Sequence, residues 1–225
     1  MFVILLGLKD LSLKEEYRSD RDNLIEEFFL PCLDNCIEYD RAVEYVALKS
    51  LTAYYFGLKS FVSNKVQIRI VTGHRLRTSD LNVLSKLYSK KTGKNFFKMN
   101  SKPEKKFQML SQMIQHNKLK IKIAMPISEE VYGTFDEKIG IFRDENDDVI
   151  AFTGTSNETF DPQNRNFESI DVFTSWNDKS RVEIKTKDFE NLWHDETKNL
   201  KVYDFEYALK NNLLIYSPEW AISLS

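Results

Sequence analysis

The sequence contains few of the residues that mark fibrous, disordered or disulfide-bonded proteins. Its 225 residues include seven glycines, five prolines and two cysteines. With 42% hydrophobic and 29% charged residues, this composition excludes collagen-like and low-complexity chains and indicates a globular protein with a substantial core. Cys32 and Cys36 lie four residues apart in a helical pattern, without the Cys-x-x-Cys spacing or the further ligands of a zinc or redox site. We expect both to be core thiols on one helix face.

Long hydrophobic runs are also missing. The apolar stretch of residues 1–6 ends at Gly7, and it has neither the length nor the basic flank of a signal peptide. We therefore expect residues 1–6 to form a buried strand. The same observations predict a cytoplasmic protein with no membrane partner.

A strong net charge is absent, but the charges are unevenly distributed. The formal net charge of −2 argues against a uniformly basic DNA-binding surface. Residues 86–106, however, contain eight lysines and one acid, and residues 129–148 contain eight acids and two basic residues. The lysine-rich segment is either a face that binds a polyanion or an ordinary solvated surface, and its composition fits both. The candidate DNA contacts within it are Lys90, Lys91, Lys94 and Lys98.

Strand and helix patterns alternate through the first half of the chain. Helical periodicity covers residues 17–39, 50–64, 78–90 and 102–117, and strand-like runs cover residues 41–48, 65–73 and 119–127. Pro31 should kink or divide the first of these helices. The alternation is typical of an α/β fold with a largely parallel sheet.

The second half has a different rhythm. Short strands are predicted at residues 138–144, 148–154 and 167–176, a helix at 181–196, and a short strand with a final helix within 201–216. Neither an internal repeat nor a low-complexity linker is present. We therefore predict one domain over residues 1–225, an α/β/α sandwich built on a mixed, largely parallel sheet.

Polar residues stand at the ends of three predicted strands in this half. Lys138 opens one strand, Asn157 follows the next, and Glu168 begins the third. Side chains at neighbouring strand ends of an α/β sheet can converge on one crevice, where a lysine and an asparagine can bind the oxygens of a phosphodiester. Gly154 would let the backbone approach the phosphate, and Thr155 and Ser156 would add donors. By spacing alone this is a common pattern.

The residues around these positions resemble a known family. The segments FDEKIGIF (135–142), AFTGTSNET (151–159) and NFESIDVF (166–173) are similar to the phospholipase D (PLD) superfamily, whose site combines His-x-Lys with Gly-Ser-x-Asn. The similarity is to its nuclease branch, which includes PLD-type restriction endonucleases and PLD domains attached to DNA helicases. Residues 16–51 also resemble the opening of the helicase-linked domains. The resemblance runs from about residue 13 to residue 214.

The resemblance implies roles for individual residues. Lys138 matches the motif lysine, Asn157 the motif asparagine, and Glu168 the glutamate that the nuclease branch carries after it. Gly154 and Thr155 match Gly-Ser. The family reaction needs no metal ion and no cofactor.

Two positions depart from the family pattern. Asp136 stands where the family has its nucleophilic histidine, and Arg143 stands where many members have an aspartate. Imidazole is a good neutral nucleophile near pH 7, whereas a carboxylate must approach a phosphodiester anion against charge repulsion. Asp136 beside Glu168 should also raise the pKa of at least one carboxyl group. Asp136 is therefore expected to remove most of the activity; His74, after a predicted strand, is the best-placed substitute among three histidines.

The single motif copy and the family together predict partners. Because each PLD active site combines two motif copies, a complete site implies a homodimer. The first functional hypothesis is a metal-independent DNA phosphodiesterase of a restriction, phage-defence or helicase-associated system, working with a helicase or ATPase. The second is a non-catalytic DNA-binding or assembly module on the same fold. A lipid-directed enzyme is disfavoured because no membrane-binding segment is evident.

Overall fold

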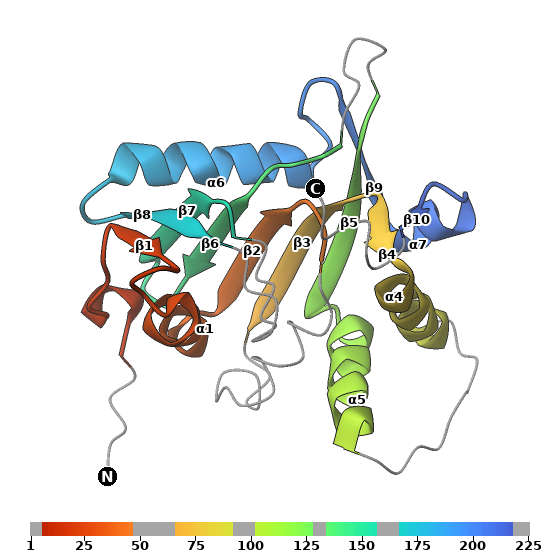
Figure 1. The fold of residues 1–225 in the computed structure, drawn as a ribbon, viewed down its shortest axis with the longest axis horizontal. Coiled ribbons are helices and arrows are strands. Elements are labelled where there is room, and N and C mark those ends of the chain that lie inside the picture. Colours follow the sequence, from red (N-terminus) through yellow and green to blue (C-terminus); the bar gives the residue numbers. More distant parts are fainter. Residues whose placement is uncertain (1–5, 47–65, 92–101, 128–133, 157–166, 218–225) are drawn as a thin grey trace.

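The computed structural model describes residues 6–46, 66–91, 102–127, 134–156 and 167–217 (Figure 1). The expected strand at residues 1–6 lies almost wholly outside this range, and the expected helix at 50–64 lies wholly outside it. Within the described parts, no helix is both long and apolar enough to cross a membrane.

Eight strands form the main sheet in the order β1-β8-β7-β6-β2-β3-β5-β9. Their bounds are β1 Glu16–Arg18, β2 Glu38–Val43, β3 Gln67–Gly73, β5 Leu119–Pro126, β6 Ile139–Arg143, β7 Val149–Gly154, β8 Ser169–Thr174 and β9 Leu200–Asp204. A second sheet pairs β4 (Arg75–Arg77) with β10 (Ile215–Ser217) in parallel. The predicted mixed α/β sheet is confirmed; the short strand β1 at its edge and the separate β4–β10 pair were not predicted.

Within the main sheet, parallel pairing is confined to the centre. Strand β3 pairs in parallel with β2 and with β5, whereas the other neighbouring pairs are antiparallel. The parallel part is thus narrower than expected, because β6, β7 and β8 follow one another through connections that reverse the chain. The turn between β6 and β7 is held by Asp144, whose side chain accepts the amides of Asn146 and Asp148 at 2.9 and 3.0 Å.

Helices cover both faces of the sheet (Figure 1). Helix α6 (Lys179–Trp193) lies on one face, where Val182, Phe189 and Leu192 pack in a cluster with Ala42 and Ile141. The other face carries α1 (Leu30–Asn35), α4 (Thr78–Lys91) and α5 (Lys102–Gln115). Two shorter helices are α7 (Phe205–Lys210) and the 3₁₀ turn η1 (Leu8–Asp10). This is the three-layered α/β/α arrangement that the sequence predicts.

The first predicted helix is divided near Pro31, as its sequence indicates. A π-helical turn, η2 (Ile25–Phe29), runs directly into α1, and Pro31 is the second residue of α1, so the helical geometry changes just before the proline. Cys32 and Cys36 are buried and free, and burial raises the pKa of each thiol. The prediction of core thiols is confirmed.

Close aromatic packing on the α1 face explains the position of one glycine. Phe152 lies against Phe28, with ring centroids 5.2 Å apart, and against Phe142 at 5.7 Å. Gly140 lies directly beneath: a Cβ there would be 2.0 Å from the Phe152 ring. The strands that carry the candidate site are therefore fixed by a dense aromatic core.

Candidate active site

The predicted site residues meet at one edge of the sheet. Ile139 pairs with Ala42 of β2 and with Thr153 of β7, and Gly154 pairs with Ile170 of β8. The start of β6, the end of β7, the start of β8 and the end of β2 therefore lie side by side. The predicted site residues at these ends are Asp136, Lys138, Gly154, Thr155, Ser156 and Glu168. Antiparallel pairing, rather than a run of parallel strands, brings them together.

Gly154 is required by the backbone at this edge. Its φ is +153°, and a Cβ would lie 2.1 Å from the carbonyl oxygen of Ser169. The next residue, Thr155, donates its amide to that same carbonyl at 2.9 Å and accepts the Ser169 amide on its hydroxyl at 3.0 Å. The Gly-Thr pair thus holds the end of β7 against β8. Its part in phosphate binding stays a prediction.

A buried arginine fixes the loop that follows. Arg41 of β2 is 3% exposed, and its guanidinium donates to the carbonyl oxygen of Ser156. The same guanidinium lies 5.0 Å from the centre of the Phe152 ring. Arg41 therefore positions the chain just before Asn157, which itself lies outside the described residues. The sequence patterns did not single out this arginine.

Lys138 lies between two carboxylates. Its ammonium is in contact with Asp136 and is 4.0 Å from Oε2 of Glu44, the residue after β2. The lysine side chain is 16% exposed, whereas that of Asp136 is 61% exposed. The Lys138 carbonyl accepts the Thr153 hydroxyl at 3.0 Å, which holds the lysine backbone in place. The cation expected to bind phosphate is thus partly buried and already paired.

Glu44 is the carboxylate that the sequence analysis missed. Burial raises the pKa of its carboxyl group, the negative charge of Asp136 raises it further, and Lys138 opposes both effects. The sequence predicted that Asp136 and Glu168 would influence each other's pKa. In the structure, the carboxyl group whose pKa Asp136 raises is that of Glu44. Its signal in the sequence was an acid within the otherwise apolar run of residues 42–48.

Glu168 belongs to the same edge. Its charge raises the pKa of the Tyr45 hydroxyl, which burial raises most strongly. The positive charge of Arg77 of β4 lowers the pKa of that hydroxyl, and the Arg77 guanidinium lies 5.2 Å from the Tyr45 ring centre. The end of β2 thus carries Glu44 toward Lys138 and Tyr45 toward Glu168. Glu168, predicted from the sequence, and Glu44, found in the structure, therefore both lie near the end of β2.

His74, the candidate substitute nucleophile, follows β3 at this edge. Gly73 before it donates its amide to the Glu44 carbonyl at 3.0 Å. The His74 Nδ1 is buried and has no hydrogen-bond partner within the described part of the chain. Burial and the nearby Arg75 lower the pKa of the imidazole, which keeps it neutral at about pH 7. A catalytic role for His74 stays a prediction.

The four candidate DNA-binding lysines lie outside the part of the chain whose side chains are described. Helices α4 and α5 flank residues 92–101, so Lys94 and Lys98 lie outside the described residues, as do the side chains of Lys90 and Lys91. The DNA-binding prediction for these four lysines is untested. Among the described residues, no group of three or more His, Cys, Asp and Glu side chains is arranged to hold a metal ion.

No protein family matches the sequence, and no curated protein sequence is significantly similar to it. The fold, in contrast, is similar to that of NucT from Helicobacter pylori, a nuclease of the PLD superfamily. That similarity covers 84% of this chain and 97% of NucT, with a TM-score of 0.50 and 12% identity. Yeast tyrosyl-DNA phosphodiesterase matches over 62% of this chain and 26% of its own, with a TM-score of 0.36 and 12% identity. The similarity to NucT shows that the chain has a PLD-like α/β/α fold, as the sequence resemblance predicted.

Proposed function

We propose that this chain is a DNA phosphodiesterase domain of the PLD type whose hydrolytic activity is reduced or lost because Asp136 occupies the position of the nucleophilic histidine. The observation that carries the proposal is the position of Lys138 at the start of β6, at the same end of the β6-β7-β8 part of the sheet as Gly154 and Glu168. Lys138 and Asn157 would bind the phosphate, and Glu168 would take part as the family resemblance implies.

The chemistry of position 136 determines the activity. With histidine there, an imidazole nitrogen would form a bond to phosphorus while the bond to the leaving oxygen breaks, and water would then cleave the phosphorus–nitrogen bond. Asp136 instead neutralises Lys138 and adds to the negative charge of Glu44. A phosphodiester anion would have to approach two carboxylates and displace one of them from the lysine. Both effects oppose turnover.

The proposal includes partners. The chain carries one copy of the motif, so a second copy of the chain would supply the other half of the site across a two-fold axis. The resemblance to helicase-linked domains and to restriction endonucleases points to a helicase or ATPase partner in restriction or phage defence. The lysine-rich segment with Lys90, Lys91, Lys94 and Lys98 would follow the DNA backbone with salt-dependent, sequence-independent affinity.

Cleavage of supercoiled DNA in EDTA by the wild-type chain and by Asp136→His tests the proposal. We expect Asp136→His to nick DNA at least about 1000-fold faster than the wild type, since it restores the nucleophile. Asp204→His is the matched control, because Asp204 is an aspartate with a 78% exposed side chain at the end of β9, and it should stay inactive. Equal cleavage by wild type and Asp136→His would show that another group is the nucleophile.

A second candidate function is a non-catalytic DNA-binding or assembly module. The ion pair between Lys138 and Asp136 favours it, because it leaves the fold intact while occupying the phosphate-binding cation. Under this alternative, the wild type and Asp136→His bind DNA with similar affinity and neither cleaves it. Binding measured by fluorescence anisotropy beside the cleavage assay separates the two functions.

A further inference from the structure

An exposed aromatic ring lies next to the candidate site. Phe167 directly precedes Glu168, and 62% of its surface is exposed. The guanidinium of Arg18 lies 4.9 Å from the centre of its ring. A phenylalanine so exposed gains little from the core, and an arginine stacked on one face of the ring leaves the other face to solvent.

Phe167 and Arg18 are held in place together. Arg18 of β1 is paired with Ser169 of β8. Directly beyond this pair, Ser19 donates its amide to the Glu168 carbonyl at 2.9 Å and accepts the Glu168 amide on its hydroxyl at 2.9 Å. The ring, the guanidinium and the backbone of a candidate site residue therefore form one fixed unit.

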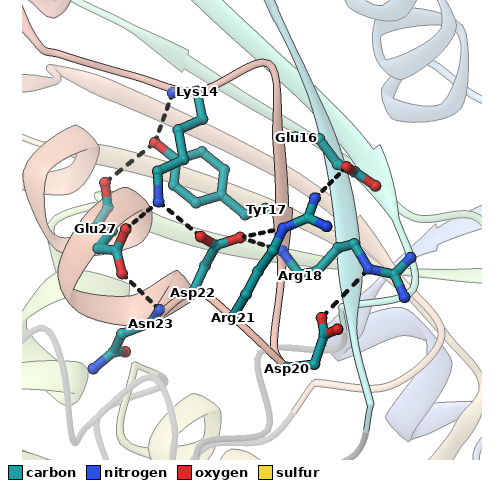
Figure 2. Close-up of polar contacts among 9 residues, drawn as sticks. All are labelled: Lys14, Glu16, Tyr17, Arg18, Asp20, Arg21, Asp22, Asn23 and Glu27. Carbon is teal, nitrogen blue, oxygen red and sulfur yellow. Dashed lines mark hydrogen bonds and ion pairs between the residues drawn. The ribbon is translucent and has the colours of Figure 1, made fainter.

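A network of charged residues holds the turn that follows β1, next to this unit (Figure 2). Asp22 accepts the Arg18 amide at 2.8 Å and the Lys14 ammonium at 2.7 Å. Lys14 also binds Glu27 at 2.6 Å, and Glu27 accepts the Asn23 amide at 2.8 Å. These contacts fix the turn that follows β1. The Arg18 side chain points away from Lys14 in Figure 2, and its Nε donates to the exposed Asp20 at 3.3 Å.

We infer that Arg18 and Phe167 form a subsite for an unpaired DNA base and its adjoining phosphate, beside the candidate active site. The base stacks on the open face of the Phe167 ring, and the phosphate takes the place of Asp20 on the Arg18 guanidinium. An exposed ion pair such as Arg18–Asp20 contributes little to stability, so a phosphate can replace the carboxylate. This inference rests on the proposed function, and it narrows the substrate class to single-stranded DNA.

The preference for single strands follows from stacking. A base within a duplex already stacks on its neighbours and pairs with its partner, so it must be unstacked before it reaches an external ring. An unpaired base has no such cost, and every base offers a flat face to an aromatic side chain. The subsite therefore favours single strands without reading their sequence.

Fluorescence anisotropy with the full chain tests the subsite. The probes are a labelled oligothymidylate, a duplex of the same length, and an oligothymidylate with abasic sites. We expect Phe167→Leu to weaken binding of the single strand by about 5- to 100-fold, and binding of the duplex and the abasic strand by less than about twofold. Arg18→Gln should weaken binding of the intact and abasic strands alike. Tyr207→Leu, at another aromatic side chain with 53% exposure, is the control and should change nothing.

The outcomes separate the subsite from the proposed function. If the wild type binds DNA but Phe167→Leu weakens all three probes equally, or weakens none, the subsite is wrong and the proposed function stands. If the wild type binds none of the probes, both are wrong. A loss confined to the intact single strand, with an unchanged thermal unfolding midpoint for the variant, establishes stacking on Phe167.

Discussion

Two lysines of this molecule are each placed between two carboxylates, and they behave differently. Lys14 lies 2.7 Å from Asp22 and 2.6 Å from Glu27, and its side chain is 51% exposed. Lys138 lies between Asp136 and Glu44, and its side chain is 16% exposed. The first arrangement joins two backbone segments near the N-terminus (Figure 2), whereas the second stands at the edge where the candidate site residues meet.

The pKa directions show what the difference means. Lys14 lowers the pKa of both of its carboxyl neighbours, and they raise the pKa of Lys14, as in an ion-pair network whose charges are satisfied. At Lys138, burial and Asp136 together raise the pKa of Glu44, so one lysine does not offset two carboxylates there. An excess of negative charge at a partly buried position is typical of functional sites. We therefore expect the Lys14 network to stabilise the fold, and we propose that the Lys138 arrangement binds a ligand at some cost in stability.

The largest expected effect separates the two lysines by activity. In the Asp136→His background, Lys138→Met should reduce DNA cleavage by at least about 100-fold, because it removes the cation that stabilises charge on the reacting phosphate. Lys14→Met in the same background should leave the rate within about twofold. Single-turnover cleavage of supercoiled DNA measures both. Similar rates for the two variants would remove Lys138 from the site.

A third cation between two carboxylates sharpens the comparison through stability. Arg69 binds Asp40, which is 6% exposed, at 2.6 and 2.7 Å, and Glu190 of α6 at 2.6 Å. Arg69→Met leaves the buried Asp40 without its partner and should lower the free energy of unfolding by about 3 kcal/mol. Lys14→Met should cost less, because Asp22 keeps its contacts with the Arg18 amide and Arg21, and the Glu27 side chain is 40% exposed. Urea denaturation of the two variants gives the comparison, and equal losses would contradict it.

The sequence predicted the elements of the fold well and the composition of the site only in part. Strands such as 65–73 and helices such as 78–90 carry long periodic patterns, so their positions were readable. The strands β1, β4 and β10 have three residues each and exist only through their neighbours, which a local pattern does not reveal. Antiparallel order in the second half depends on which strands pair, and that is decided by packing.

The site residues that no sequence motif indicated, Glu44 and Arg41, also depend on strand pairing. Lys138, Gly154 and Glu168 stand in a motif, so their common edge was foreseeable. Glu44 and Arg41 lie about a hundred residues earlier in the chain and reach the site only because β2 pairs with β6. Their roles depend on a pairing partner that a linear motif does not contain.

Glu44→Gln removes the excess negative charge beside Lys138, and the pH dependence of its stability tests the Lys138 arrangement. Because the folded-state pKa of Glu44 is raised, its ionisation destabilises the native state, so Glu44→Gln should become more stable than the wild type as pH rises through that pKa. At about pH 7 the variant should also bind inorganic phosphate roughly fivefold more tightly, since about 1 kcal/mol of repulsion is removed. Below the usual pKa of a glutamate, the two proteins should agree. Phosphate titration followed by NMR, with thermal unfolding at each pH, measures both effects.

The smallest expected effect has the opposite sign. The pKa of Glu27 is lowered, first by its hydrogen bond to Lys14, so its stabilising contribution is present above the usual pKa of a glutamate and is lost as pH falls through the folded-state value. Glu27→Gln should therefore be slightly less stable than the wild type at about pH 7, and the difference should shrink in acid and in high salt. Thermal unfolding of Glu27→Gln and Glu44→Gln across the same pH series then gives two difference curves of opposite sign. If both variants lost stability at neutral pH, Glu44 would be a structural partner of Lys138, and the two lysines would serve the same purpose.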